Sequence, residues 1–312
     1  LICKPLTVYM IGLSTLYDAA LLNRVVIALL TSGFTLTHTT SKFPNLGHTL
    51  NLGVGMLTAF LFSQSTGLPV FTSIPIVILI TGFYNLATYR IIFKRIEKPE
   101  LAGLAGLGLL YAGVNLLTIT LHYLRTRIET TWWCGPPSIS IEQLHFHYPR
   151  NTYLGITECT WINVIIITAA VVGFQIIKKK GKYTLFRAYS ENHELLMIQG
   201  INAEKLVQAS WFIAGCLGGL GGAMIPYFFK GYPGKYSQYF FTDVAASAAF
   251  AGMRSPKLGF LAGLVVGFLE IIIVTLNQAT IGVWIGEYNA IFPMMIMVAS
   301  FIVMSLRPDQ ST

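Results

Sequence analysis

Three polar side chains lie within or between long apolar runs of this sequence, where a charged or hydrogen-bonding group is costly. Glu270 is the only acidic residue well inside such a run, and a carboxylate at the centre of a bilayer costs roughly 2.5 to 3.5 kcal/mol on insertion scales. It must therefore face protein, water or a partner. Glu270 could line a pathway through the membrane, or it could be a structural carboxyl that is hydrogen-bonded to a neighbouring helix.

Asn45 and His48 occupy a polar turn between two runs. They could line a channel, where unwound backbone is accommodated, or Asn45 could cap a helix and His48 could pack inside.

A polar, helix-compatible stretch covers residues 178–205 between two apolar runs. Such a stretch must project into water, where another protein can contact it, and Glu191 and Glu194 would be available to basic residues of that protein. We expect Gly200 to end one helix and Asn202 to cap the next. The alternative is a solvated loop whose lysines only reflect membrane orientation.

The composition explains why so few side chains are available for chemistry. Hydrophobic residues make up 54% of the 312 residues and charged residues 11%. Apolar runs of roughly 17 to 22 residues match the ~20 needed to cross a bilayer as a helix, whereas barrel strands are only ~10 residues long. The sequence predicts an all-α fold: a polytopic integral membrane helical bundle that forms a single transmembrane domain over residues 1–312.

About eight to ten transmembrane helices are expected, with spans near 25–41, 49–63, 70–89, 101–121, 161–177, 206–229, 258–277 and 289–306. Residues 6–22 could form a further span that turns at Asn23 and Arg24. Residues 240–253 are too few to cross untilted and predict a short or re-entrant helix. Glycines crowd the sixth span, and Gly259, Gly263 and Gly267 recur at a spacing of four in a later one; such small residues mark close helix contacts.

The net charge of +8 indicates membrane orientation rather than nucleic-acid binding, because Lys and Arg are retained on the cytoplasmic side. Placing 90–100 and 178–205 inside also places Lys42, Arg254 and Lys257 inside. The C-terminus is then cytoplasmic, and the longest outer loop covers residues 122–160.

The outer loop 122–160 contains aromatic residues suited to the membrane interface or to a protein contact. Cys134 and Cys159 would lie on the oxidising side and could form a disulfide. His122, His145 and His147 are scattered without thiolate or carboxylate geometry, so no metal site is expected.

Several short motifs occur in a fixed order along the chain. Gly33-Phe34-Thr35 precedes Asn45-Leu46-Gly47-His48, and Gly55 follows; then come Arg187-Ala188, Glu191-Asn192 and Gly200-Ile201-Asn202; then Gly252, Ser255, Gly259, Gly263, Gly267 and Glu270; and finally Arg307-Pro308. This order resembles the membrane permease subunits of branched-chain amino-acid-type ABC importers, a family that includes urea and amide permeases. The usual Gly-Gly-x-Gly-Ser turn is replaced here by Ala251-Gly252-Met253-Arg254-Ser255, which adds a charge.

The resemblance implies a transport subunit that is not an enzyme and holds no cofactor of its own. The sequence contains no G-x-x-x-x-G-K-[ST] phosphate-binding loop, so ATP would be hydrolysed by separate ATPase subunits that dock on 187–202. The family also implies a second permease subunit, an external solute-binding protein, a lipid membrane of a prokaryotic cell, and a small solute: a branched-chain amino acid, or urea or an amide.

Two other classes of protein stay open from the residues. A secondary transporter driven by an ion gradient predicts buried ionisable groups in paired broken helices, for which Glu270 and Asp243 are candidates. A non-transporting membrane scaffold would tolerate loss of the docking residues.

Overall fold

The computed structural model describes residues 4–66, 70–131, 202–227, 232–280 and 291–305, with a few short pieces between 152 and 189. Its elements are α1 (Lys4–Ser41), α2 (Leu50–Thr66), η1 (Val70–Ser73), α3 (Ile74–Ile91), η2 (Phe93–Arg95), α4 (Pro99–Thr131), β1 (Thr152–Tyr153), β2 (Ile156–Thr157), α8 (Ala203–Met224), η3 (Ile225–Tyr227), α9 (Pro233–Phe250), α10 (Pro256–Thr280) and α11 (Ile291–Ser305). The two short strands pair in antiparallel fashion.

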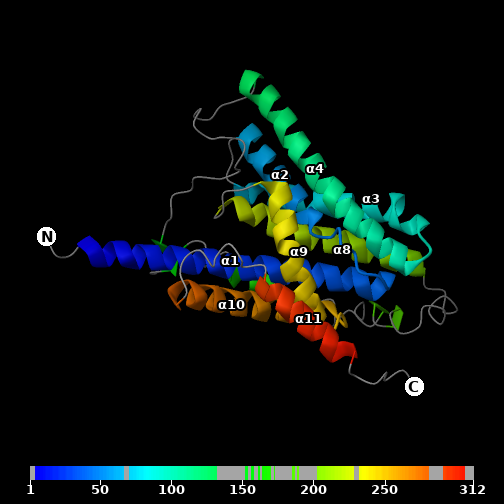
Figure 1. The fold of residues 1–312 in the computed structure, drawn as a ribbon. Helices are drawn as coiled ribbons and strands as arrows, with labels where there is room; N and C mark the ends of the chain where they lie inside the picture. The colour runs from blue at the N-terminus through cyan, green and yellow to red at the C-terminus, as the bar shows by residue number, and fades with distance from the viewer. Residues whose placement is uncertain are drawn as a thin grey trace.

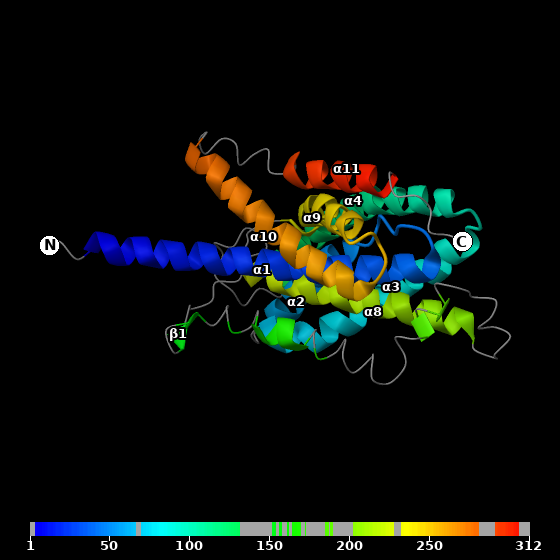
Figure 2. The ribbon, with the colours of Figure 1, turned by 90° about the horizontal axis from the view of Figure 1, so that it is seen from below.

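The helices form a bundle. Each of α1 and α8 has more extensive contacts with its neighbours than any other helix has. The long helix α1 lies along α10 and also contacts α8 and α9, while α2 and α3 pack against α8 (Figure 1). The view in Figure 2 shows α10 and α11 on one side of the bundle and α3 with α8 on the other. The predicted all-α helical bundle is confirmed.

Four described helical segments are long and apolar enough to cross a membrane: Ile74–Arg95, Pro99–Leu124, Ala203–Met224 and Pro256–Ile273. Leu50–Ser63 and Ile291–Ser300 are shorter apolar helices. These segments match predicted spans to within a few residues. The predicted span 161–177 lies largely outside the described residues, where only scattered helical positions are seen.

The turn predicted at Asn23 and Arg24 is wrong, because α1 runs unbroken from Lys4 to Ser41. Its 38 residues correspond to about 57 Å at 1.5 Å per residue, well beyond the ~30 Å hydrocarbon core of a bilayer. No Gly or Pro interrupts the helix near Arg24. The guanidinium of Arg24 instead lies 4.4 Å from the centre of the Phe268 ring, a cation–π contact that accommodates the charge.

The segment 240–253 is the C-terminal part of α9, an unbroken helix that begins at Pro233 rather than near 240. The polar residues at its start, including Lys235, hid this first half in the sequence. The helix ends in a Schellman motif: Met253 N donates to Ala248 O at 3.0 Å and Gly252 N to Ala249 O at 2.9 Å. Gly252 has φ +64°, as this motif requires, and Met253 follows at φ 52°.

The predicted helix contacts at glycines are confirmed. A β-carbon on Gly263 of α10 would lie 2.5 Å from the Cα of Ala28 in α1, and one on Gly55 of α2 would lie 2.6 Å from the carbonyl oxygen of Gly219 in α8. These backbones approach closely because neither glycine carries a side chain. The contacts fix α10 along α1 and α2 along α8.

Candidate functional site

A buried polar cluster lies where α2 begins, facing α1, α3 and α8. The amide nitrogen of Asn51 donates to His48 O at 2.8 Å and to Asn85 Oδ1 at 3.2 Å. Asn85 Nδ2 in turn donates to Trp211 O in α8 at 2.6 Å. One chain of hydrogen bonds thus joins the α1–α2 turn, α2, α3 and α8.

The structure buries Asn45 and His48 completely in this region. The His48 ring meets Phe34 edge-on, with ring centres 6.4 Å apart, and its Nε2 faces Gly33, where a β-carbon would lie 2.8 Å away. His48 therefore packs inside the bundle. Asn45 Oδ1 has no hydrogen-bond partner in the described ranges, α2 included, so this oxygen does not cap α2. Their assignment to a translocation pathway stays a prediction.

Two carboxyl groups are buried between α9 and α10. Asp243 and Glu270 expose only 1% and 4% of their surface, and they are close enough to interact electrostatically. Asp243 Oδ2, Glu270 Oε2 and the nearby hydroxyl of Ser247 on α9 have no hydrogen-bond partner in the described part of the chain. Glu270 therefore faces protein rather than lipid, as predicted, and it has a buried acidic neighbour.

An aromatic cluster lies at one end of the bundle, near the last residues of α1 and the first turns of α8. Trp211, which is fully buried, lies with its ring centre 5.0 Å from Phe93, 5.2 Å from Tyr89 and 6.2 Å from Phe43. Ala102 of α4 and Val207 of α8 complete the cluster. We call this set the Trp211 cluster; it joins residues from the α1–α2 turn, α3, η2, α4 and α8.

The predicted coupling loop 178–205 contacts the Trp211 cluster through one of its described residues, Tyr189. Ala188 and Tyr189 are helical and half-buried, and Tyr189 contacts the cluster. This burial raises the pKa of the Tyr189 phenol. Asn202 is the N-cap of α8, as predicted: its Oδ1 accepts from Lys205 N at 3.0 Å. Arg187, Glu191, Asn192, Glu194, Gly200 and Ile201 lie outside the described residues, as do Cys134 and Cys159 of the outer loop 122–160.

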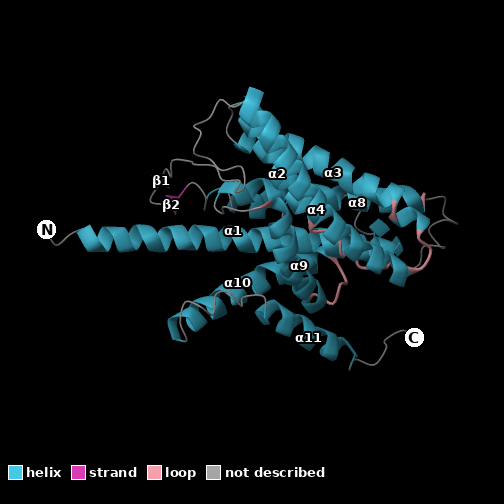
Figure 3. Cartoon of the chain, turned by 45° about the horizontal axis from the view of Figure 1, so that its top comes forward, coloured by secondary structure: helices cyan, strands magenta, loops and turns pink. Residues whose placement is uncertain are grey.

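The basic residues assigned to one side of the membrane gather at this same end. Lys94 of η2 forms an ion pair with Glu204 of α8, and Arg90 Nη2 donates to Gln208 Oε1 at 2.6 Å. The start of α10 lies here too, because Gly259 packs on Thr35 of α1 and the His38 ring lies against the backbone of Met253. The loops at this end are drawn in pink in Figure 3.

Comparison with known proteins decides the class of protein. Residues 16–301 match the model of a family described as "Branched-chain amino acid transport system / permease component". The chain belongs to this family. A probable branched-chain amino acid transport permease protein, LivH, of Methanocaldococcus jannaschii is 21% identical over 299 residues, which cover 94% of this chain and 91% of that protein. No solved structure matches.

The chain is therefore a multi-pass membrane permease subunit, a component of a transport system. Those family motifs that fall within the described residues mark close contacts in this permease. Gly33 contacts His48, Gly55 contacts α8, and the α10 glycines contact α1.

The sequence alone did not point to Asn51, Asn85 or Trp211. Asn85 looks unremarkable between Tyr84 and Leu86, and only its contact with α8, 126 positions away, reveals its role. The one available signal was an amide inside an apolar run, since such a group requires a partner.

Proposed function

We propose that this permease subunit belongs to an ABC importer that carries a small solute into the cell, with a branched-chain amino acid as the first candidate and urea or an amide as the second. ATP is hydrolysed by separate ATPase subunits, and the chain holds no cofactor. A second permease subunit and an external solute-binding protein complete the assembly. The family match and the relative's name support the solute class.

The observation that carries this proposal is the contact between Tyr189 and the Trp211 cluster. In our proposal an ATPase binds the coupling loop through Arg187, Ala188, Glu191, Asn192, Glu194, Gly200, Ile201 and Asn202. A displacement of that loop then acts on Trp211 through Tyr189. Packed cores shift between discrete arrangements rather than deforming continuously. The displacement of Trp211 therefore moves α3, α4, α8 and the end of α1 together.

The orientation follows from the charges. Lys42, Arg90, Lys94, Arg254 and Lys257 lie at the end of the bundle that carries the Trp211 cluster, and the positive-inside rule supports a cytoplasmic position for that end. We infer a prokaryotic cell membrane with the C-terminus on the cytoplasmic side. The outer loop 122–160 then faces the solute-binding protein.

We propose Asn45, His48 and Glu270 as groups that respond to translocation. Each is buried, and two of them carry an oxygen without a hydrogen-bond partner among the described residues: Asn45 Oδ1 and Glu270 Oε2. Buried polar groups without partners are costly. A rearrangement that opens a water-filled path beside them would satisfy these atoms.

The test combines extraction with uptake. The chain is expressed with candidate ATPase subunits and a candidate binding protein, extracted in mild detergent, and reconstituted in vesicles with labelled leucine and binding protein outside. We expect the ATPases to co-purify and uptake to require ATP. Arg187→Glu combined with Gly200→Pro should abolish both, whereas Lys235→Gln, at the opposite end of α9, should change neither. Uptake that persists without ATP and follows an ion gradient would refute the proposal.

A further inference from the structure

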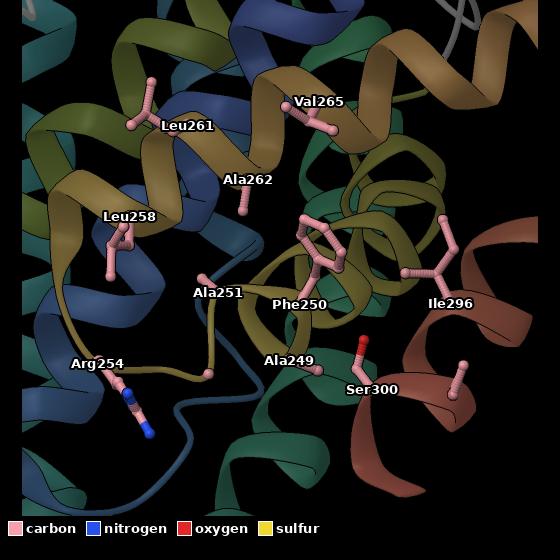
Figure 4. A pocket seen from close by; sticks show the side chains of 12 residues that line it. Ala249, Phe250, Ala251, Arg254, Leu258, Leu261, Ala262, Val265, Ile296 and Ser300 are labelled. Atoms are coloured by element: carbon pink, nitrogen blue, oxygen red, sulfur yellow. The ribbon is translucent and has the colours of Figure 1, made fainter. Parts of the chain in front are cut away.

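A groove lies beside the α9–α10 turn, away from the polar clusters described above. It has a volume of about 650 Å³ and is lined by the end of α9, the first turns of α10 and the middle of α11. Figure 4 shows Phe250, Leu258, Leu261, Val265 and Ile296 around it, with Arg254 at one end. The volume is within the ~300 to 1,000 Å³ of small-molecule sites.

The lining of the groove suits a hydrocarbon chain. Among its lining side chains only Arg254 and Ser300 carry polar atoms. Leu258, Leu261 and Val265 are each nearly half exposed along α10, over about 10 Å at 1.5 Å per residue. A polar solute would lose its hydration there without finding partners.

The end of the groove at the α9–α10 turn is cationic. Arg254 lies at the groove itself, and Lys257 follows in the first turn of α10; both side chains are exposed. Within the described ranges no carboxylate pairs with either cation, since the ion pair found there joins Lys94 to Glu204. The turn holds Arg254 in place because Gly252 and Met253 close the Schellman motif and Ser255 Oγ accepts from Leu258 N at 3.3 Å.

We propose that this groove binds one phospholipid with an anionic headgroup, with one of its two acyl chains between α10 and α11 and its phosphate at Arg254 and Lys257. An apolar slot with basic residues at its cytoplasmic mouth fits the chemistry of an anionic lipid. A second copy of this chain fits less well, because a symmetric interface brings the same patch from both copies. Two sets of unpaired cations would then meet in a low-dielectric setting.

The test uses phosphatidylglycerol as the probe. The permease is reconstituted in nanodiscs containing equal phosphatidylglycerol and phosphatidylcholine, re-extracted in a delipidating detergent, and examined by native mass spectrometry. We expect about one phosphatidylglycerol per chain on the unmodified protein and at least a tenfold lower occupancy on Arg254→Gln/Lys257→Gln. Ser300→Phe places a larger side chain in the groove but keeps both cations, and this variant should also lose the lipid.

The matched control is Lys235→Gln, which removes an exposed cation from the other end of α9 and should retain the lipid. Equal occupancy in the double variant and in Lys235→Gln would overturn the proposal. So would retention of phosphatidylcholine in place of phosphatidylglycerol. A Leu261→Cys variant that forms a disulfide-linked dimer and excludes lipid would assign the groove to a second copy instead, which also overturns it.

Discussion

Trp211 Nε1 donates a hydrogen bond of 2.8 Å to Ser41 Oγ, which ties α8 to the last residue of α1. The same indole is fully buried, and its ring is tilted against those of Phe93 and Tyr89. The backbone carbonyl of Trp211 accepts a hydrogen bond from Asn85. One residue thus joins α8 to α1, η2 and α3. We infer that these elements move as a unit at this end of the bundle.

Trp211→Ala should destabilise the permease strongly, because it leaves a cavity among aromatic rings. Removal of a buried aromatic side chain costs about 3 to 5 kcal/mol. Thermal unfolding in detergent, followed by intrinsic fluorescence of the remaining tryptophans or by circular dichroism, measures the loss. Trp211→Phe keeps a ring and mainly loses the hydrogen bond to Ser41, worth about 0.5 to 1.5 kcal/mol. Its unfolding temperature should lie between those of the unmodified protein and the Ala variant. Equal unfolding temperatures for the Ala and Phe variants would contradict this ranking.

Gly263→Ala should separate α10 from α1, because its β-carbon would lie 2.5 Å from the Cα of Ala28. The backbone of Ala28 cannot rotate away as a side chain would, so the helices must shift. The matched control is Gly108→Ala in α4, where nothing lies within 4 Å of the added carbon. There the change should stabilise the helix by up to about 1 kcal/mol. Unfolding temperatures should move in opposite directions; a parallel shift would count against the close contact.

The glycine contacts show what the sequence could predict. Gly259, Gly263 and Gly267 recur every four residues, so they share one face of a helix, and the structure packs that face on α1. The start of α8 was equally readable, because the predicted cap, Asn202, accepts from Lys205 N through its side chain.

The sequence failed where distant contacts decide the outcome. Arg24 suggested a turn, but the Phe268 ring on α10 accommodates its charge and α1 continues. Asn85 gave no sign of its bond to Trp211, because hydropathy describes each helix alone and not its neighbours. The sequence named Asp243 and Glu270 as candidate buried groups but did not show that they are neighbours, because hydropathy does not reveal that α9 packs on α10.

Asn85→Leu should destabilise the bundle by leaving both Trp211 O and the Asn51 amide with one partner fewer. Each buried group left unsatisfied costs about 1 to 3 kcal/mol. Because Asn51 and Asn85 share a hydrogen bond, Asn51→Leu/Asn85→Leu should lose less than the sum of the single changes. A double-variant cycle on unfolding temperature measures this coupling. Additive losses would show that the 3.2 Å contact contributes nothing.

Glu270→Gln separates a structural from a transport role for this carboxyl. The substitution keeps the shape of the side chain and replaces one of two neighbouring buried carboxyl groups, which interact electrostatically, with a neutral amide. We therefore expect unchanged or higher unfolding temperature together with a several-fold loss of ATP-driven uptake. Glu270→Lys should lower the yield of inserted protein, because it places a cationic side chain at membrane depth. Full uptake by Glu270→Gln would make the group a structural carboxyl.

Tyr189→Ala should uncouple ATP hydrolysis from transport, because it removes the side chain that joins the coupling loop to the Trp211 cluster. Tyr189 is only half-buried, so the bundle should keep most of its stability while the transmitted displacement is lost. We expect ATPase subunits to remain bound and to hydrolyse ATP at least half as fast, with leucine uptake reduced tenfold or more. Tyr189→Phe keeps the ring contact and should retain both activities. If uptake and hydrolysis fall together in the alanine variant, Tyr189 contributes to ATPase docking rather than to transmission.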